Sequence, residues 1–182
     1  TASGRGAAAV TDLDEVVARV DDRVRPDERE RERLERVAAD LVAAVERELA
    51  DRGVDGDALR VGSTARDTWL AGGRDVDVVV RLPSGTDRDD LERVGLSVGH
   101  AVLPDGHEEY AQHPYVRGTV DGFDVDLVPC HDVATATEAR SAVDRTPFHD
   151  AYLDGRLDGL TADVRVAKQF LTAVGAYGSD LR

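Results

Sequence analysis

Residues 61–82 read VGSTARDTWLAGGRDVDVVVRL, which predicts a Gly-Ser turn, a short helix, a second turn and a strand. Side chains alternate between the two faces of a strand, so Asp75 and Asp77 share one face while the valines at even positions share the other. The valine face can pack against a core, whereas a bare buried carboxylate is costly. Two parallel carboxylates on a rigid strand are suitable ligands for hard divalent cations.

The Gly-Ser turn is a candidate phosphate site. Gly62 and Ser63 follow an expected strand at residues 58–61 and begin the short helix. Glycine allows close approach of the backbone to a phosphate, and the first helical turn presents N–H donors. Arg66 projects from the same turn and can reach that phosphate. Ser63 also has an alternative role as the N-cap of this helix.

A hairpin is predicted further along the chain. Two β-like runs, 115–120 and 123–130, flank the dipeptide Asp121-Gly122, which favours a two-residue type I′ turn. In the resulting register Arg117 lies opposite Asp126, and both face away from the core.

Asp126 is therefore the third carboxylate expected beside Asp75 and Asp77. Three carboxylates on adjacent strands can hold two Mg²⁺ ions, an arrangement that suits in-line phosphoryl transfer. The alternative is that Asp126 only pairs with Arg117, and Asp75 with Arg74 or Arg81. The Gly-Ser turn upstream and the VDLVPC strand favour the metal site.

The remaining chain is mainly helical. Apolar residues recur at helical spacing over 12–23, 34–49, 87–103 and 160–174. We expect these helices mainly on the valine face of the sheet. Between them, the stretch around His107 is expected to be a polar loop, and the pattern from Ser141 onward is irregular.

Composition limits the class of protein. The chain has 182 residues with 41% apolar content, enough for one real core, and Cys130 is the only cysteine, so an internal disulfide is excluded. No run is long enough to span a membrane and no signal peptide is evident, so a cytoplasmic protein without membrane contact is expected. Residues 1–10 are small and aperiodic and are interpreted as a tail.

The charge balance is strongly acidic. There are 37 acidic and 23 basic residues, a net charge of −14, and Lys168 is the only lysine. This pattern favours a halophilic protein, with an ordinary acidic protein as the alternative. At 1 M salt the Debye length is about 3 Å, so the net charge does not exclude an RNA partner.

Four segments together resemble one family. They are VGSTARDTWLAGGRDVDVVVRLP, HPYVRGTVDGFDVDLVPC, SAVDRTPFH and VRVAKQFLTAVGAYGSDLR. In this order and spacing they resemble the archaeal (class I) CCA-adding tRNA nucleotidyltransferases, members of the DNA polymerase β-like nucleotidyltransferase superfamily. The resemblance covers about residues 11–182. The RTPFH and AKQFL…GAYGS blocks are the most specific parts of it.

The resemblance implies an α+β fold with a polymerase β palm-like mixed sheet and flanking helices. It also implies template-independent addition of C, C and A to the tRNA 3′ end from CTP and ATP, with Mg²⁺. Family members are longer and carry body and tail domains. Residues 11–150 would then be the catalytic head and 151–182 the start of the neck. The oligomeric state is left open, with a homodimer as the family alternative.

The resemblance also assigns site residues. Asp75, Asp77 and Asp126 look like the metal-binding catalytic carboxylates. The residues that resemble nucleotide contacts, beside Gly62, are Ser63, Arg66, His149, Lys168 and Tyr177. The alternatives for the last three are a packed or solvent-exposed histidine, a surface lysine and a packing tyrosine.

Two other functions remain open on the sequence. One is another nucleotidyltransferase of the superfamily that acts on a different acceptor. The other is a non-catalytic nucleotide- or RNA-binding module with the same fold. A pure binding module has no need of three carboxylates, so the catalytic interpretation is favoured.

Overall fold

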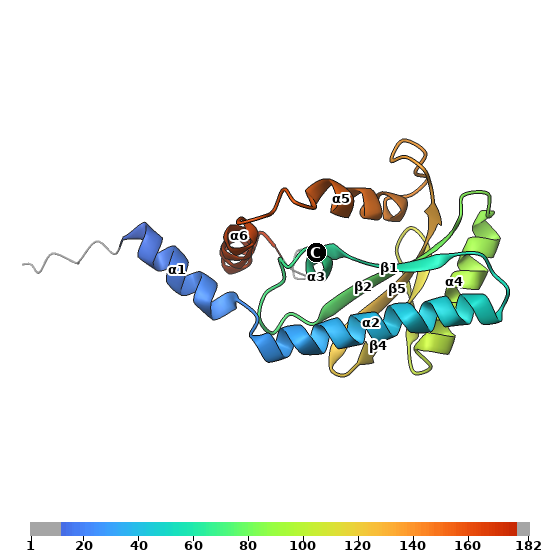
Figure 1. Cartoon of the computed structure of the whole chain (residues 1–182), viewed down its shortest axis with the longest axis horizontal. Helices are drawn as coiled ribbons and strands as arrows, with labels where there is room; N and C mark the ends of the chain where they lie inside the picture. Colours follow the sequence, from blue (N-terminus) through green and yellow to red (C-terminus); the bar gives the residue numbers. More distant parts are fainter. Residues whose placement is uncertain (1–11, 178–182) are drawn as a thin grey trace, which may run out of the picture.

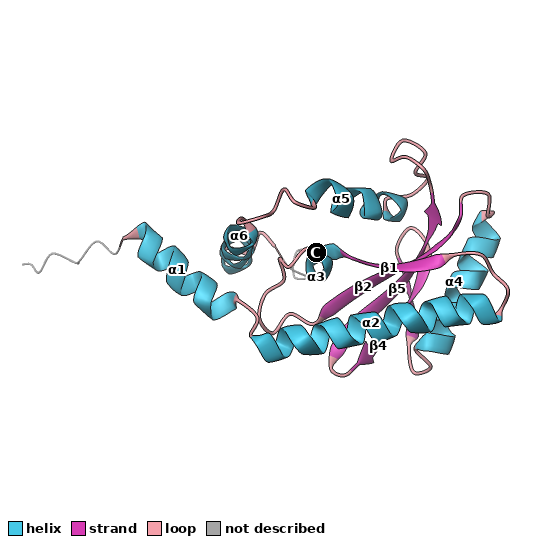
Figure 2. Ribbon diagram, viewed as in Figure 1, coloured by secondary structure: helices cyan, strands magenta, loops and turns pink. Residues whose placement is uncertain are grey.

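The computed structural model describes residues 12–177 and contains a mixed five-stranded sheet with helices on both faces (Figures 1 and 2). The strand order is β1-β2-β5-β4-β3, in which β2 and β5 are parallel and every other neighbouring pair is antiparallel. The two carboxylate-bearing strands, β2 and β5, therefore lie side by side. The strands are β1 (Asp57–Val61), β2 (Asp75–Pro83), β3 (His107–Tyr110), β4 (Pro114–Val120) and β5 (Phe123–Asp132).

Helices precede, connect and follow the strands. Helices α2 and α4 pack on one face of the sheet, while η1 and α5 lie against the other, and α6 contacts α1 (Figure 1). The helices are α1 (Leu13–Val24), α2 (Glu28–Asp51), α3 (Gly62–Ala65), α4 (Arg88–Val102), the 3₁₀ turn η1 (Val143–Arg145), α5 (Thr146–Leu153) and α6 (Thr161–Ala173). No helix in the described range is long and apolar enough to cross a membrane.

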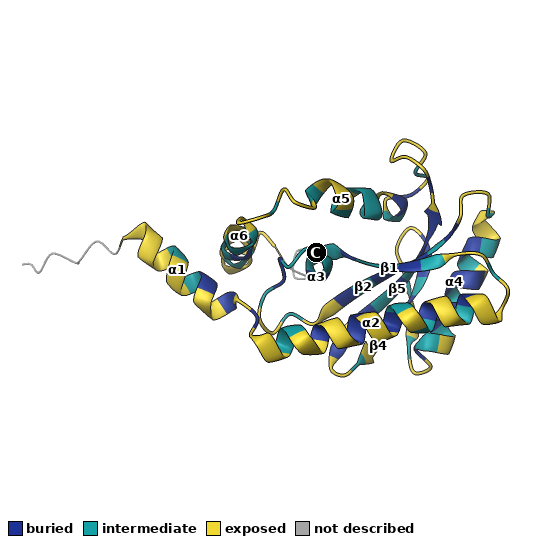
Figure 3. Ribbon diagram, viewed as in Figure 1, coloured by how far each residue is buried: buried dark blue, intermediate teal, exposed yellow. Residues whose placement is uncertain are grey.

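The main core lies between the sheet and the α2/α4 layer (Figure 3). The even-numbered valines of β2 are fully buried there, as the alternation predicts. Their partners from β5, α2 and α4 are equally inaccessible, because aliphatic side chains at helical spacing interlock with the strand face. The fully buried members include Val76, Val78, Val80, Leu127, Val45, Leu91 and Val98.

The opposite face has a smaller apolar cluster at one end only. Val61, Val79 and Cys130 form it, with Leu59 and Val143 packed at its edge. Burial raises the pKa of the Cys130 thiol to about 12, so this cysteine behaves as a small hydrophobe and remains unionised. The other end of this face carries the carboxylates.

The hairpin prediction is confirmed. Asp121 and Gly122 have φ values of 49° and 77°, as a type I′ turn requires, and Arg117 pairs with Asp126 across β4 and β5. The predicted loop around His107 is wrong, because residues 107–110 form the edge strand β3. A polar, mostly exposed edge strand lacks the apolar alternation by which strands are recognised.

The irregular stretch after Ser141 contains structure that the periodicity does not show. Helix α5 has only eight residues, with a proline in its first turn and no buried residue, so it presents no apolar stripe. The predicted tail at 1–10 lies outside the described residues.

Candidate active site

A pocket of about 670 Å³ opens on the carboxylate end of the sheet, beneath α6. Its lining combines acidic groups from β2 and β5 with basic groups from α3, β4 and α6. All but one of the predicted site residues meet there. The polar residues around it are Gly62, Ser63, Arg66, Thr68, Asp75, Asp77, Arg117, Asp126, Lys168 and Tyr177. The exception is His149, an exposed residue of α5 that does not line this pocket.

The strand register brings the acidic groups together. Parallel pairing of β2 with β5 puts Asp77 directly opposite Asp126, and Asp75 lies two residues before Asp77 on the same face. Burial, followed by the charges of Asp126 and Asp75, raises the pKa of Asp77 to about 6. Burial also raises the pKa of Asp126, although the nearby Arg117 opposes this shift. The pocket thus concentrates negative charge that the protein only partly neutralises.

Arg117 is the nearest cation to this cluster. Its Nε lies 3.5 Å from Asp126 Oδ1, and its Nη2 lies 3.7 Å from Asp75 Oδ1. The ion pair considered as an alternative on the sequence is therefore present, but neither contact is a hydrogen bond. Asp126 Oδ1 is buried and has no hydrogen-bond partner among the described residues.

These groups fit a divalent cation in chemistry and charge. They offer hard oxygen ligands, a buried carboxylate oxygen without a hydrogen-bond partner, and a carboxyl group whose ionisation is opposed by its neighbours. Between residues 12 and 177, no three acidic, histidine or cysteine side chains are already converged around one point. The side chain of Asp75 is 70% exposed, so the more enclosed carboxylates are those of Asp77 and Asp126. The assignment of all three as metal ligands stays a prediction.

Gly62 is fixed between two carboxylates. It has φ +82°, and a Cβ at this position would lie 2.5 Å from Asp77 Oδ2, so a larger residue would collide with β2. Its N–H donates to Asp150 Oδ2 at 3.0 Å. Ser63 lies inside α3, whose N-cap is Val61 without a side-chain hydrogen bond, so the alternative role of Ser63 as N-cap is wrong.

Arg66 also contacts Asp150. Its Nη1 donates to Asp150 Oδ1, which makes Asp150 the shared partner of Arg66 and the Gly62 amide. Sequence reasoning missed Asp150, although it follows His149 directly. The sequence offered no signal for it, because α5 has no apolar stripe that would reveal the helix or the direction in which Asp150 points.

Lys168 is anchored beside the site. Its Nζ donates to the Thr68 carbonyl oxygen at 2.9 Å, and burial followed by the charge of Arg66 lowers its pKa. One turn earlier, the Nη1 of Arg165 donates to the carbonyl oxygen of Asp67 at 2.8 Å. Two cations of α6 thus bind consecutive carbonyls that follow α3. Lys168 is not a chance surface lysine.

A mixed sheet that presents carboxylates from two neighbouring strands beside a Gly-Ser turn and basic side chains defines a nucleotidyltransferase fold. The chain belongs to the nucleotidyltransferase domain family, which matches residues 42–149. Enzymes of this family generally use divalent metal ions.

Curated relatives extend the match over nearly the whole chain. A CCA-adding enzyme from Halorubrum lacusprofundi is 62% identical over 94% of this chain and 37% of its own length. One from Halobacterium salinarum is 58% identical over 95% of this chain and 38% of its own length. A more distant one, from Methanoregula boonei, is 45% identical over 86% of this chain and 34% of its own. The chain thus spans little more than a third of these relatives.

Solved structures agree with the fold. Escherichia coli MS115-1 CdnC with ATP superimposes with a TM-score of 0.66 at 20% identity, over 92% of this chain and 60% of that one. The Cid1 poly(U) polymerase gives a TM-score of 0.61 at 17% identity, over 87% of this chain and 46% of that one. At these identities the likeness concerns the fold alone.

Proposed function

We propose that this chain is the catalytic part of a CCA-adding enzyme, which adds C, C and A to tRNA 3′ ends from CTP and ATP. The observation that carries the proposal is the 62% identity to a CCA-adding enzyme across 94% of the chain. The match includes the pocket in which acidic and basic groups converge. Because the chain spans 37% of that relative, we assign residues 11–150 to a catalytic head and 151–182 to the start of a neck.

In this proposal Asp75, Asp77 and Asp126 hold Mg²⁺. Bound Mg²⁺ supplies activation of the acceptor hydroxyl and stabilisation of the charge on the triphosphate and the leaving pyrophosphate. Asp77 and Asp126 are paired across two central strands of a packed sheet, so their separation is set by the backbone. This preorganisation keeps the ligands in place before the substrates arrive.

The basic side chains bind the triphosphate. Arg66 at the end of α3 and Lys168 on α6 both line the pocket, and Ser63 adds a hydroxyl to the same lining. Arginine provides a planar fork for phosphate oxygens, whereas lysine provides a compact point charge. Tyr177 lies at the rim with 49% exposure and is assigned to the nucleotide as well. The predicted role of His149 stays a prediction, because the pocket does not include it.

The acceptor is the tRNA 3′ end, whose hydroxyl attacks the α-phosphate of CTP or ATP. We also propose that the protein works in a cytoplasm of high salt concentration. A net charge of −14 with a single lysine supports this setting, as do relatives from Halorubrum and Halobacterium.

Calorimetric titration of this chain with CTP, ATP and GTP, with and without Mg²⁺ in molar KCl, tests the nucleotide site. We expect Mg²⁺ to strengthen the binding of CTP and ATP, and Asp77→Ala to abolish that enhancement. The matched control is Asp89→Ala, which removes an exposed carboxylate on α4. An Asp77→Ala protein that retains metal-enhanced binding would contradict the proposal.

Extension of a tRNA that lacks CCA, by the full-length protein, then tests the acceptor. Incorporation of C, C and A should require Asp77. Nucleotide binding without tRNA extension, together with extension of another acceptor, would favour a different nucleotidyltransferase activity.

A further inference from the structure

We infer that Asp150 is a positioning residue for the phosphate contacts of this site, because it binds the Gly62 amide and the Arg66 guanidinium through separate carboxylate oxygens. This inference rests on the proposed function and names a residue that neither the family motifs nor the sequence pattern assigned. Asp150 lies on α5, outside the sheet and outside the last helix.

The two contacts engage both oxygens of the carboxylate. Oδ2 accepts the N–H of Gly62 at 3.0 Å, while Oδ1 accepts Nη1 of Arg66. The side chain of Asp150 is 15% exposed, so little solvent competes with its partners. Hydrogen bonds that involve an ionised group are stronger and more directional than neutral ones. Asp150 therefore fixes both the peptide at the start of α3 and the side chain that leaves its end.

The contact between Asp150 and Gly62 also affects the position of the α3 turn relative to Asp77 on β2. The α-carbon of Gly62 lies so close to Asp77 that a methyl group would meet Asp77 Oδ2 at 2.5 Å. Gly62 is thus held on one side by Asp150 and bounded on another by Asp77. A shift of this turn would change the distance between the phosphate donors and the carboxylates.

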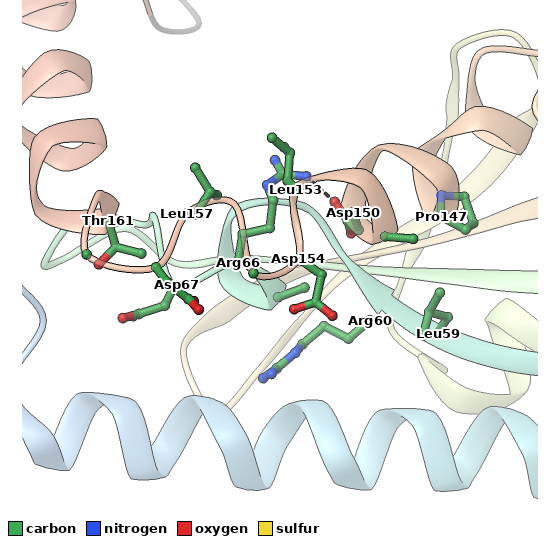
Figure 4. A pocket seen from close by; sticks show the side chains of 15 residues that line it. Leu59, Arg60, Arg66, Asp67, Pro147, Asp150, Leu153, Asp154, Leu157 and Thr161 are labelled. Carbon is green, nitrogen blue, oxygen red and sulfur yellow. Dashed lines mark hydrogen bonds and ion pairs between the residues drawn. The ribbon is translucent and has the colours of Figure 1, made fainter.

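The Arg66 contact comes from outside the carboxylate pocket. Asp150 lines a neighbouring pocket of about 610 Å³ between β1, α3 and α5, whereas Arg66 lines both pockets (Figure 4). A guanidinium carries five N–H groups, and its single hydrogen bond to Asp150 uses only Nη1. The carboxylate can therefore orient the plane of Arg66 while other N–H groups serve the triphosphate.

The competing idea is that Asp150 occupies donors that the phosphate needs, and so inhibits binding. The location of Asp150 outside the carboxylate pocket favours positioning. The two ideas also predict opposite signs. Removal of a positioning carboxylate weakens triphosphate binding, whereas removal of a competitor strengthens it.

The test is Asp150→Asn, with CTP and CMP titrated separately in the presence of Mg²⁺. An amide nitrogen cannot accept a hydrogen bond, so asparagine can satisfy only one of the two donors. We expect the affinity for CTP to fall about tenfold or more, and the affinity for CMP to fall much less. A merely structural lesion would lower both affinities equally, so the CTP-to-CMP ratio is the diagnostic readout.

Asp154→Asn is the matched control. Asp154 follows Asp150 by one helical turn, lines the same neighbouring pocket and is exposed. It should leave both affinities unchanged. Circular dichroism and thermal unfolding establish that each variant is folded, and Asp150→Ala replaces Asp150→Asn if the latter does not fold.

Unchanged or tighter CTP binding by a folded Asp150 variant would overturn the positioning role while the proposed function stands. Absence of CTP binding by the unaltered chain would instead overturn the proposed function, and the positioning role with it. An equal loss of CTP and CMP affinity would reduce Asp150 to a purely structural residue.

Discussion

The two faces of the central sheet are stabilised in different ways. The α2/α4 face is an apolar layer in which Val76, Val78 and Val80 of β2 have no accessible surface. The opposite face carries carboxylates, and α6 borders their pocket while its charged contacts go to α1 and to the connection after α3. Arg165, the buried residue of α6, contacts Asp21 on α1 and the backbone of Asp67, while the apolar Phe170 of the same helix is 63% exposed.

The α2/α4 face therefore determines the stability of the fold, and the carboxylate face carries the groups proposed to bind ligands. Apolar burial is non-directional and fixes the strands, so it also holds in place the carboxylates that these strands present on the other face. Ion pairs and hydrogen bonds are directional, and each depends on a few atoms. Variants on the first face should therefore affect the whole fold, and variants on the second should act locally.

The largest effect is expected for Val78→Asp. This change places an unpaired carboxylate in a fully buried position of β2 and removes apolar contacts. We expect a loss of more than about 4 kcal/mol in the free energy of unfolding, measured by denaturant titration in molar KCl. Val78→Ile is the control, with a cost below about 2 kcal/mol. A stable Val78→Asp protein would show that this face is not the core.

Arg165→Ala should have the next largest effect. It removes a cation that is 4% exposed and leaves Asp21 with Arg25 as its remaining ion-pair partner. Because Arg25 still compensates Asp21, we expect a loss of about 2 to 3 kcal/mol in the free energy of unfolding, at or below the cost of an uncompensated buried charge. Hydrogen exchange should show the loss in α1 and α6, with the sheet amides unchanged.

Arg23→Ala, an exposed arginine on α1, is the control for Arg165→Ala and should alter exchange nowhere. Faster exchange throughout the sheet in Arg165→Ala would indicate that the two faces are not separate in stability.

The sequence predicted the first face better than the second. Alternation in β2 identified both the buried valines and the carboxylates, and Asp121-Gly122 fixed the β4/β5 register that puts Asp126 opposite Arg117. These features are local, because strand period and turn geometry depend on adjacent residues.

The contacts of α6 and α5 are not local. The apolar stripe of α6 predicted the helix, yet the described contacts of this helix with the α3–β2 connection are made by Arg165 and Lys168. Asp150 reaches Gly62 across 88 residues of sequence. Sequence periodicity does not indicate which backbone group an isolated charged side chain will contact. The contacts of Arg165, Lys168 and Asp150 could therefore be identified only from the structure.

Asp77→Asn should stabilise the metal-free protein near neutral pH. The pKa of Asp77 is raised to about 6 in the folded state, so protonated Asp77 favours folding. That contribution is fully present below the unfolded pKa, near 3.9, and is lost as pH rises through 6. Asp77→Asn removes this pH dependence. After allowance for solvent screening, we expect a gain of about 2 kcal/mol above pH 7 and little change at pH 4.

Asp89→Asn is the control for this pH series, because Asp89 is an exposed carboxylate on α4 whose charge is not among the causes of the shift at Asp77. Urea unfolding with a metal chelator, from pH 4 to pH 8, measures both variants. A gain for Asp77→Asn that does not depend on pH would contradict the cause assigned to it.

Lys168→Ala is expected to have the smallest effect on stability and a clear effect on binding. Its Nζ donates to the Thr68 carbonyl oxygen, and the loss of this bond should cost about 1 kcal/mol. The same ammonium lines the carboxylate pocket, so the affinity for CTP should fall about tenfold in calorimetric titration. Lys168→Arg tests the geometry, since a longer, planar cation keeps the charge but not the point contact. A Lys168→Ala protein with unchanged CTP affinity would show that Lys168 only anchors α6 to the connection after α3. The charged contacts on this face would then hold the helix in place without binding the nucleotide.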